Sequence, residues 1–416
     1  MDFKVTLFRK FFWRFWWSVY GLLAVPYTRS SARGHQIIPQ EGKLLLVGNH
    51  ITPLDPFWAA FYAYRRVHFM ASAHLFRFPL IRWPLYQIGA FPKAKYTKDA
   101  KSMEALFSYN EQDECVSLFP EGQRSWNGRT EPMLPGIGRL IKRLDAPVIF
   151  VRLLTAYHWH PRWATYARSV NVRLEYSEPV HFPKEMSDDE IQAEVDRRLY
   201  VDADDHDPGQ ACFGFRLAWG LPTFLWACPQ CYTQEGLGVD PDDGDVVMCR
   251  SCQRRWRLDV ALKLHPLTPD TLKLTVATAH DRLVANFGEH PVADGVRFEL
   301  DRTALEGEDV VLAVLSDRDA EGKVIARGKA RLTDRKLEIQ GKDGTLLWEK
   351  TLTEITAISL EVKSRLTLRT DEGLFDFDPI GESRYKWGSF IGGHRRAMLL
   401  AEGKPITGQS LSKAGV

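Results

Sequence analysis

A histidine and a carboxylate stand five positions apart at the junction of two apolar segments. His50 follows the run LLLVG (44–48), and Asp55 precedes PFWAAFYAY. Five helical residues would separate the two side chains by roughly 140°, and an odd spacing in a strand would place them on opposite faces. The turn-forming pair Thr52-Pro53 lets them meet. A histidine oriented by a carboxylate is a general base; the alternative is a core histidine next to an N-cap aspartate.

A second stretch, FPEGQRS (119–125), also follows an apolar strand-like run directly. A Pro-Glu-Gly turn that leaves a strand exposes backbone N–H groups, and Arg124 adds a guanidinium suited to phosphate. The alternative is a surface turn with a solvated arginine. Taken alone, this stretch does not decide between the two.

Four of the six cysteines form two CxxC pairs with seventeen residues between them: Cys228, Cys231, Cys249 and Cys252. Two such knuckles present four thiolates tetrahedrally to Zn²⁺, and the turn-rich segment between them has the layout of a zinc ribbon. With four cysteines and no open position, one structural Zn²⁺ is predicted. The alternative is a redox dithiol, which two matched pairs disfavour. Without an export signal, the pattern indicates a reducing compartment.

The first two stretches, about 70 residues apart, form the pattern NH-x4-D followed by FPEG-x-RS, which resembles the PlsC-type glycerolipid acyltransferases. GAFPKAK (89–95) resembles the intermediate motif of that family, and APVIFV (146–151) resembles its apolar fourth motif. The resemblance covers about residues 1–200.

The resemblance implies roles for individual residues. His50 would take the proton from an acceptor hydroxyl that attacks an acyl thioester, and Asp55 would orient His50. Gly122 and neighbouring N–H groups would face the oxyanion or the phosphate of the acceptor. Arg124 would bind that phosphate, and Glu121 would shape the turn. The substrate-binding set implied in this way is Lys95, Glu121, Gly122, Arg124 and Ser125.

Two positions depart from the family pattern. The intermediate motif usually ends in arginine, where this chain has Lys95. Lysine keeps the charge but loses the bidentate fork, so a different acceptor is an open alternative. The third motif often has threonine where this chain has Gln123. Neither change affects the His–Asp pair.

The surrounding sequence predicts elements that position these residues. From 35 to about 200, short apolar runs alternate with helical patterns, which favours an α/β layer with a mostly parallel sheet. An acidic segment ending in Pro-Gly (201–210) reads as a linker. Beyond about 259, alternating strands separated by glycine turns predict an antiparallel β domain. Its element order, with a closing helix at 382–400, loosely resembles a pleckstrin-homology or GRAM-like barrel. The alternative is an accessory domain that steers assembly or a partner.

The amino-terminal segment is basic and aromatic. Residues 1–40 carry six Lys and Arg against one acid, and FFWRFWW is six-sevenths aromatic. Its apolar piece (15–26) is too short to span a bilayer, so an amphipathic helix at the membrane interface is expected. The alternative, not exclusive, is a helix packed on the protein. The whole chain, with 416 residues and a net charge of +2, gives no sign of nucleic-acid binding.

The sequence therefore predicts four regions: an amphipathic helix over 1–34, a PlsC-like acyltransferase domain over 35–205, a zinc ribbon over 222–258 and a β-rich domain with closing helix over 259–416. The expected function is transfer of a fatty acyl chain from acyl-CoA or acyl-carrier protein to a lysophospholipid, foremost 1-acylglycerol-3-phosphate, in phospholipid biosynthesis. The expected location is peripheral, on the cytoplasmic face of a membrane. The alternatives are another lyso-lipid acceptor and a non-catalytic lipid-binding scaffold.

Overall fold

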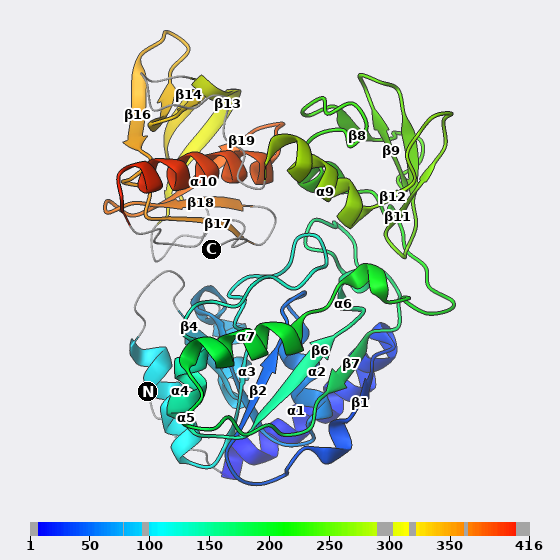
Figure 1. The fold of residues 1–416 in the computed structure, drawn as a ribbon, viewed down its shortest axis with the longest axis vertical. Coiled ribbons are helices and arrows are strands. Elements are labelled where there is room, and N and C mark those ends of the chain that lie inside the picture. Colours follow the sequence, from blue (N-terminus) through cyan, green and yellow to red (C-terminus); the bar gives the residue numbers. More distant parts are fainter. Residues whose placement is uncertain are drawn as a thin grey trace. The chain divides into compact units, whose positions relative to one another are not determined.

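The computed structural model describes residues 7–77, 79–93, 100–288, 303–315, 322–361 and 365–404 (Figure 1). The chain divides into two compact units. The first comprises Met1–Arg162, Tyr166–Phe215 and Val260–Leu262, and the second comprises Trp163–Thr165, Arg216–Asp259 and Lys263–Val416. Each unit is described by itself.

The first unit is built on a seven-stranded sheet with the order β1-β7-β6-β2-β5-β3-β4. Its neighbours pair in parallel except β6 with β7, which are antiparallel. The predicted mostly parallel α/β sheet is confirmed. The strands are β1 (Ser31–Arg33), β2 (Leu44–Gly48), β3 (Val67–Ser72), β4 (Ala90–Lys93), β5 (Cys115–Leu118), β6 (Val148–Leu153) and β7 (Arg173–Tyr176).

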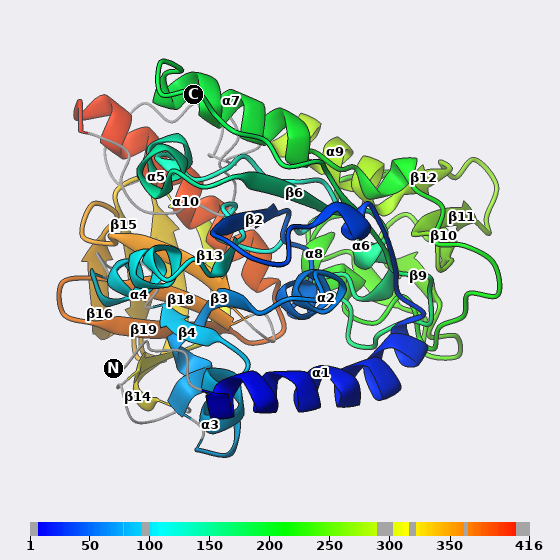
Figure 2. The same ribbon diagram turned by 90° about the horizontal axis from the view of Figure 1, so that it is seen from below.

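Helices cover both faces of this sheet, as parallel sheets require. The helices are α1 (Leu7–Thr28), α2 (Asp55–Tyr62), α3 (Pro79–Gln87), α4 (Ala100–Glu111), α5 (Ile137–Leu144), α6 (Ala156–Trp159) and α7 (Asp188–Leu199). Side chains of α4, α5 and α7 share one core cluster with β2, β5 and β6. Residues of α1, α2 and α3 pack on the opposite face, and Figure 2 shows α1 and α3 on the other side of the sheet from α5 and α7.

The central strand β2 explains why the site lies where it does. All five of its residues are buried, so the strand has no solvent face and reads as a continuous apolar run. β2 lies between β5 and β6 and is parallel to both. The segments that follow these three strands therefore leave the same edge of the sheet, where residues far apart in the sequence meet.

Within its described residues, the second unit contains two antiparallel sheets. The smaller has the order β12-β11-β10-β9-β8, and the larger has the order β16-β15-β14-β13-β19-β18-β17. The smaller sheet consists of β8 (Leu237–Val239), β9 (Val246–Cys249), β10 (Arg255–Leu258), β11 (Lys263–Pro266) and β12 (Leu274–Thr275). The larger consists of β13 (Thr303–Leu315), β14 (Lys323–Thr333), β15 (Lys336–Gln340), β16 (Leu346–Thr351), β17 (Ala357–Glu361), β18 (Arg365–Arg369) and β19 (Leu374–Pro379).

The described part of this unit contains three helices: α8 (Leu221–Phe224), α9 (Val276–Phe287) and α10 (Arg384–Ala401). The predicted antiparallel β domain and its closing helix are confirmed, except that the expected strand VRFEL (296–300) lies outside the described residues. The likeness to a pleckstrin-homology or GRAM-like barrel and the four region boundaries stay predictions. Among the described residues, no helix is long and apolar enough to cross a membrane.

At Gly138, α5 lies close to the start of α7. A Cβ built at Gly138 would lie 2.0 Å from the carbonyl oxygen of Asp188, which is backbone and cannot rotate away. We therefore expect Gly138→Ala to destabilise the first unit by about 1–3 kcal/mol, despite the higher helix propensity of alanine. Lys101→Ala, at an exposed position of α4 away from this contact, is the control. Thermal unfolding checks this, and equal stability of the two variants would contradict the packing.

Candidate functional site

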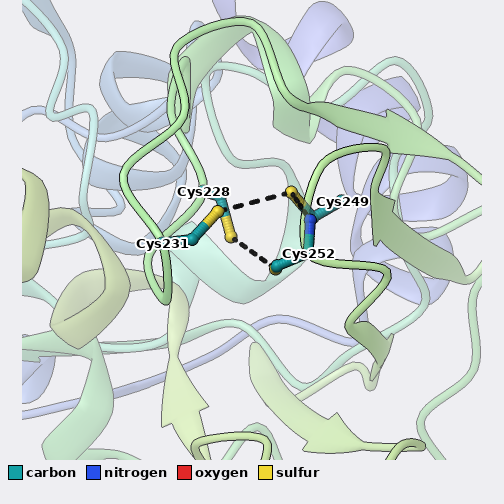
Figure 3. A group of neighbouring side chains, drawn as sticks. All are labelled: Cys228, Cys231, Cys249 and Cys252. Carbon is teal, nitrogen blue, oxygen red and sulfur yellow. Dashed lines mark hydrogen bonds between the residues drawn. The ribbon is translucent and has the colours of Figure 1, made fainter.

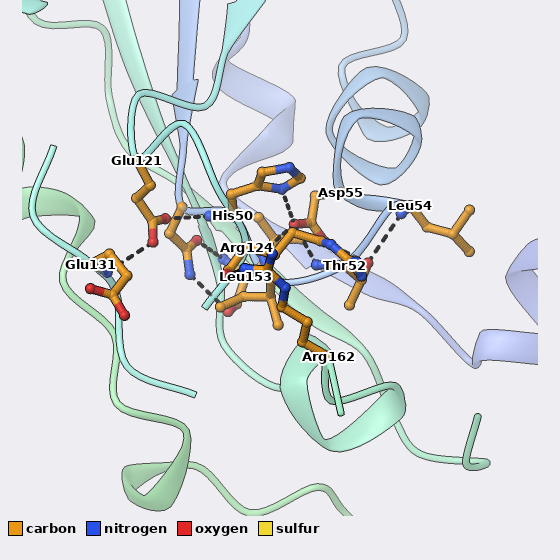
Figure 4. A network of polar contacts seen from close by, with 11 residues as sticks. His50, Thr52, Leu54, Asp55, Glu121, Arg124, Glu131, Leu153 and Arg162 are labelled. Atoms are coloured by element: carbon orange, nitrogen blue, oxygen red, sulfur yellow. Dashed lines mark hydrogen bonds and ion pairs between the residues drawn. The ribbon is translucent and has the colours of Figure 1, made fainter. Parts of the chain in front are cut away.

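The loop after β2 places His50 and Asp55 in direct contact (Figure 4). His50 Nδ1 lies 2.8 Å from Asp55 Oδ2, and the turn at Thr52-Pro53 between them makes this possible. The Asp55 side chain is fully buried, whereas the His50 side chain is 23% exposed. A carboxylate on Nδ1 fixes the tautomer, so Nε2 is the nitrogen left to exchange a proton with a substrate.

Asp55 is held by three further donors from the same turn. The backbone N–H groups of Ile51 and Thr52 donate to Oδ2 at 2.5 and 2.8 Å, and the Thr52 hydroxyl donates to Oδ1 at 2.7 Å. Asp55 is also the first residue of α2, where the helix dipole favours a negative charge. These donors stabilise a buried carboxylate that would otherwise be costly.

The loop after β5 is attached to the loop after β2 by two hydrogen bonds. The Glu121 carboxylate accepts from the His50 N–H and, at 2.8 Å, from the Glu131 N–H. The Ser125 N–H donates to the His50 carbonyl at 2.9 Å. Glu121 is 1% exposed, and burial raises its pKa well above the usual value, while its two N–H donors act in the opposite direction. Each of the two Glu121 carboxylate oxygens thus accepts a hydrogen bond from a backbone N–H group.

Two more of the sequence-predicted residues are engaged within the same loop. The Gly122 N–H donates to the Phe119 carbonyl at 3.2 Å, and the Gly122 φ of 71° is the left-handed conformation that glycine adopts readily. The Ser125 hydroxyl accepts from the Gly128 N–H at 2.9 Å. Their substrate-binding roles stay predictions. Lys95 lies outside the described residues.

Arg124 differs from its neighbours in the loop. Among the described residues, its guanidinium has no hydrogen-bond or ion-pair partner, although its side chain is only partly exposed. Burial lowers the pKa of Arg124, and the nearby Asp55 carboxylate opposes that shift. A partly desolvated cation that has no ion-pair partner among the described residues, on a loop bonded to His50, is suited to binding an anionic ligand.

Sequence reasoning missed one residue that joins two strand ends and two residues that contact the loop after β5. Asn49 is fully buried, and its amide oxygen accepts from the Leu153 N–H at 2.7 Å, which ties the end of β2 to the end of β6. Its position beside His50 was an available signal. Tyr157 and Arg162, which follow β6, contact the loop after β5 and carry no motif.

The four predicted metal-ligand cysteines come together in the second unit (Figure 3). All four Sγ atoms lie within 4.8 Å of one another, and Cys231–Cys249 and Cys228–Cys252 are 3.7 and 3.8 Å apart. These distances exceed a disulfide bond. A tetrahedral Zn²⁺ with bonds of about 2.3 Å requires sulfur–sulfur edges of about 3.8 Å. The arrangement therefore fits a four-coordinate metal.

The first knuckle is bonded to α9 and α10. Arg282 donates to the Pro229 carbonyl at 2.7 Å and to the Tyr232 hydroxyl at 2.9 Å. The ammonium of Lys386, a 3% exposed residue, lies 2.8 Å from the Glu235 carboxylate. Metal binding would thus fix the shape of a segment on which two helices depend.

Comparison with known proteins gives a match to the family model described as Acyltransferase over residues 29–153. Two curated relatives, the 1-acyl-sn-glycerol-3-phosphate acyltransferases of Limnanthes alba and Limnanthes douglasii, are each 25% identical over 144 residues. Each alignment covers 33% of this chain, and the chain spans about half the length of these relatives. The crystal structure of the 1-acyl-sn-glycerophosphate acyltransferase PlsC from Thermotoga maritima aligns with a TM-score of 0.41 and 20% identity, covering 46% of this chain and 78% of that one.

Removal of one cysteine should release the metal and loosen both helices. We expect Cys249→Ser to lose about one equivalent of zinc and to raise amide hydrogen exchange in α9 and α10, because the knuckle loses its cross-link. Cys212→Ser, at a partly exposed cysteine outside the cluster, is the control and should retain the zinc. Metal analysis and hydrogen exchange of the purified full chain check this. Unchanged zinc content in Cys249→Ser would contradict a metal site here.

Proposed function

We propose, from the premise that residues 29–153 form an acyltransferase domain, that this chain transfers a fatty acyl group from a thioester to the hydroxyl of a lysophospholipid. The observation that carries the proposal is the His50–Asp55 contact at 2.8 Å, together with the Arg124 guanidinium, whose charge interacts with that of Asp55. A general base and a cation next to each other suit an acceptor that carries both a hydroxyl and a phosphate.

The chemistry would proceed by direct transfer. His50 Nε2 takes the hydroxyl proton as the acceptor oxygen attacks the thioester carbonyl carbon, and Asp55 stabilises the imidazolium that forms. The tetrahedral intermediate then collapses: the carbon–sulfur bond breaks and the thiolate takes the proton from His50. Atoms and charges balance without a nucleophilic side chain on the enzyme.

The acceptor we propose is 1-acylglycerol-3-phosphate, with Arg124 as the partner of its phosphate. The names of the two curated relatives agree with this choice. The donor would be acyl-CoA or acyl-carrier protein. Because the Arg124 side chain is partly desolvated and has no ion-pair partner among the described residues, an acceptor phosphate would offset the cost of burying that charge. Another lyso-lipid phosphate would satisfy the same cation.

We also propose that α1 lies at a membrane surface. Phe11, Phe15 and Leu22 are 70%, 55% and 75% exposed and fall within about 40° of one another around the helix. The opposite side packs on α2, where Trp17 and Tyr20 contact Phe57. The packed face anchors the helix to the protein, and the exposed apolar face would enter the headgroup boundary.

The base can be tested by substitution. We expect His50→Ala to lower kcat for lysophosphatidate acylation by about 10²–10⁴-fold, and Asp55→Asn to lower it as well, because the tautomer would no longer be fixed. Transfer from an acyl-CoA to lysophosphatidate in mixed micelles is the measurement, with Arg139→Met as a control at an exposed position. Wild-type turnover in His50→Ala would rule out the mechanism, and an inactive unaltered chain would favour the lipid-binding scaffold.

Membrane binding can be tested without disturbing the packed face. We expect the triple variant Phe11→Ser, Phe15→Ser and Leu22→Ser to bind anionic vesicles several-fold more weakly, because apolar area is lost from the interface while Trp17 and Tyr20 remain. Co-sedimentation with sucrose-loaded vesicles is the measurement. Leu267→Ser, at a leucine in the second unit that is 46% exposed, is the control. Equal binding by the triple variant would exclude this face.

A further inference from the structure

The peptide unit between Arg124 and Ser125 is held at both ends. Its N–H, that of Ser125, donates to the His50 carbonyl at 2.9 Å. Its carbonyl, that of Arg124, accepts from Arg162 Nη1 at 2.7 Å (Figure 4). One end is therefore fixed to the residue that carries the proposed base, and the other end to a guanidinium that follows α6. A peptide plane fixed at both ends fixes the position of the Arg124 Cα, from which the side chain leaves the backbone.

The next part of the loop is held from the same side. The Arg162 guanidinium lies 4.4 Å from the centroid of the Trp126 ring, and the Tyr157 hydroxyl donates to the Trp126 carbonyl at 2.5 Å. Tyr157 is 2% exposed, so its hydroxyl is an internal contact. Gly128 permits this approach, since a Cβ there would lie 2.6 Å from the Tyr157 ring.

We propose that Arg162 and Tyr157 are positioning residues that set the place of the Arg124 guanidinium relative to His50, and so determine affinity for a phosphorylated acceptor. The proposal rests on the proposed function and adds residues that no motif of the loop contains. Neither residue takes part in the chemistry. Arg162 acts through the Arg124 carbonyl and the Trp126 ring, and Tyr157 acts through the Trp126 carbonyl.

A positioning role differs measurably from direct phosphate binding by Arg162. If Arg162 acts through Arg124, its removal has no further effect once the Arg124 guanidinium is gone, because residues that act as one unit are not additive. If Arg162 contacts the phosphate itself, the two losses multiply. A side chain displaced by about 1 Å can cost up to about 10²-fold in efficiency, so the effect is large enough to measure.

The test uses Arg162→Met, Tyr157→Phe, Arg124→Met and the double variant Arg124→Met with Arg162→Met. We expect Arg162→Met to raise KM for lysophosphatidate about tenfold, with little change in kcat or in KM for the acyl-CoA. Tyr157→Phe keeps the ring and loses only the hydroxyl, so it should shift the same KM in the same direction by less. The double variant should match Arg124→Met. Arg139→Met, whose side chain is 83% exposed, is the control.

The outcomes distinguish the positioning role of Arg162 and Tyr157 from the proposed function. An active chain in which Arg162→Met retains the wild-type KM, or in which the double variant loses activity multiplicatively, overturns the positioning role while the acyl transfer stands. A folded but inactive unaltered chain overturns the proposed function, and with it the positioning role of Arg162 and Tyr157. Thermal unfolding checks that each variant is folded. Should Arg162→Met not fold, Tyr157→Phe decides, and an unchanged acceptor KM in that variant contradicts the proposal.

Discussion

A fully buried carboxylate is the constraint on which the rest of the site depends. Asp55 receives hydrogen bonds from two backbone N–H groups and the Thr52 hydroxyl, and contacts His50 Nδ1. Because a buried charge without such donors costs several kcal/mol, the turn between β2 and α2 cannot relax without leaving that charge exposed to an apolar interior. The position of His50 therefore follows from the hydrogen bonds that the buried Asp55 carboxylate requires. With the turn held in this way, the His50 imidazole lies partly exposed at the edge of the sheet, where a substrate could meet it.

A single bonded turn would still be mobile relative to the sheet, and two buried side chains prevent this. Asn49 ties the end of β2 to β6 through the Leu153 backbone. Glu121 ties it to the loop after β5 through the His50 N–H. Removal of either partner would leave buried backbone donors unsatisfied, which costs about 1–3 kcal/mol each. Gly48 allows close packing below, since a Cβ there would lie 2.8 Å from the Phe119 ring. Three neighbouring strand ends thus form one rigid platform.

The part of this arrangement that could be predicted from the sequence depends on residues close together in the chain. The apolar runs gave β2, β5 and β6, and the Thr52-Pro53 turn indicated that His50 and Asp55 meet. The contacts of Tyr157 and Arg162 with the loop after β5 could not be predicted. They join residues more than thirty positions apart and use backbone carbonyls, which every sequence has. The same limit applies to Glu121: its place after a strand was visible, but its contact with the His50 N–H depends on the order of strands in the sheet.

The four clustered cysteines of the second unit lie where a bound metal would organise a larger domain. A ribbon of this size buries too little apolar surface to be stable alone, so its fold would depend on the metal. Its first knuckle carries Glu235, whose carboxylate contacts Lys386 and accepts from the Ser383 N–H at the start of α10. A second ion pair joins Lys386 to Glu382 at 2.7 Å. A buried ammonium with two carboxylates is stable only while both stay in place. Release of a metal bound by the four cysteines would therefore free one carboxylate and leave the amino-terminal turn of α10 with an under-compensated buried charge. The order of α10 would in that case depend on four sulfur atoms outside it.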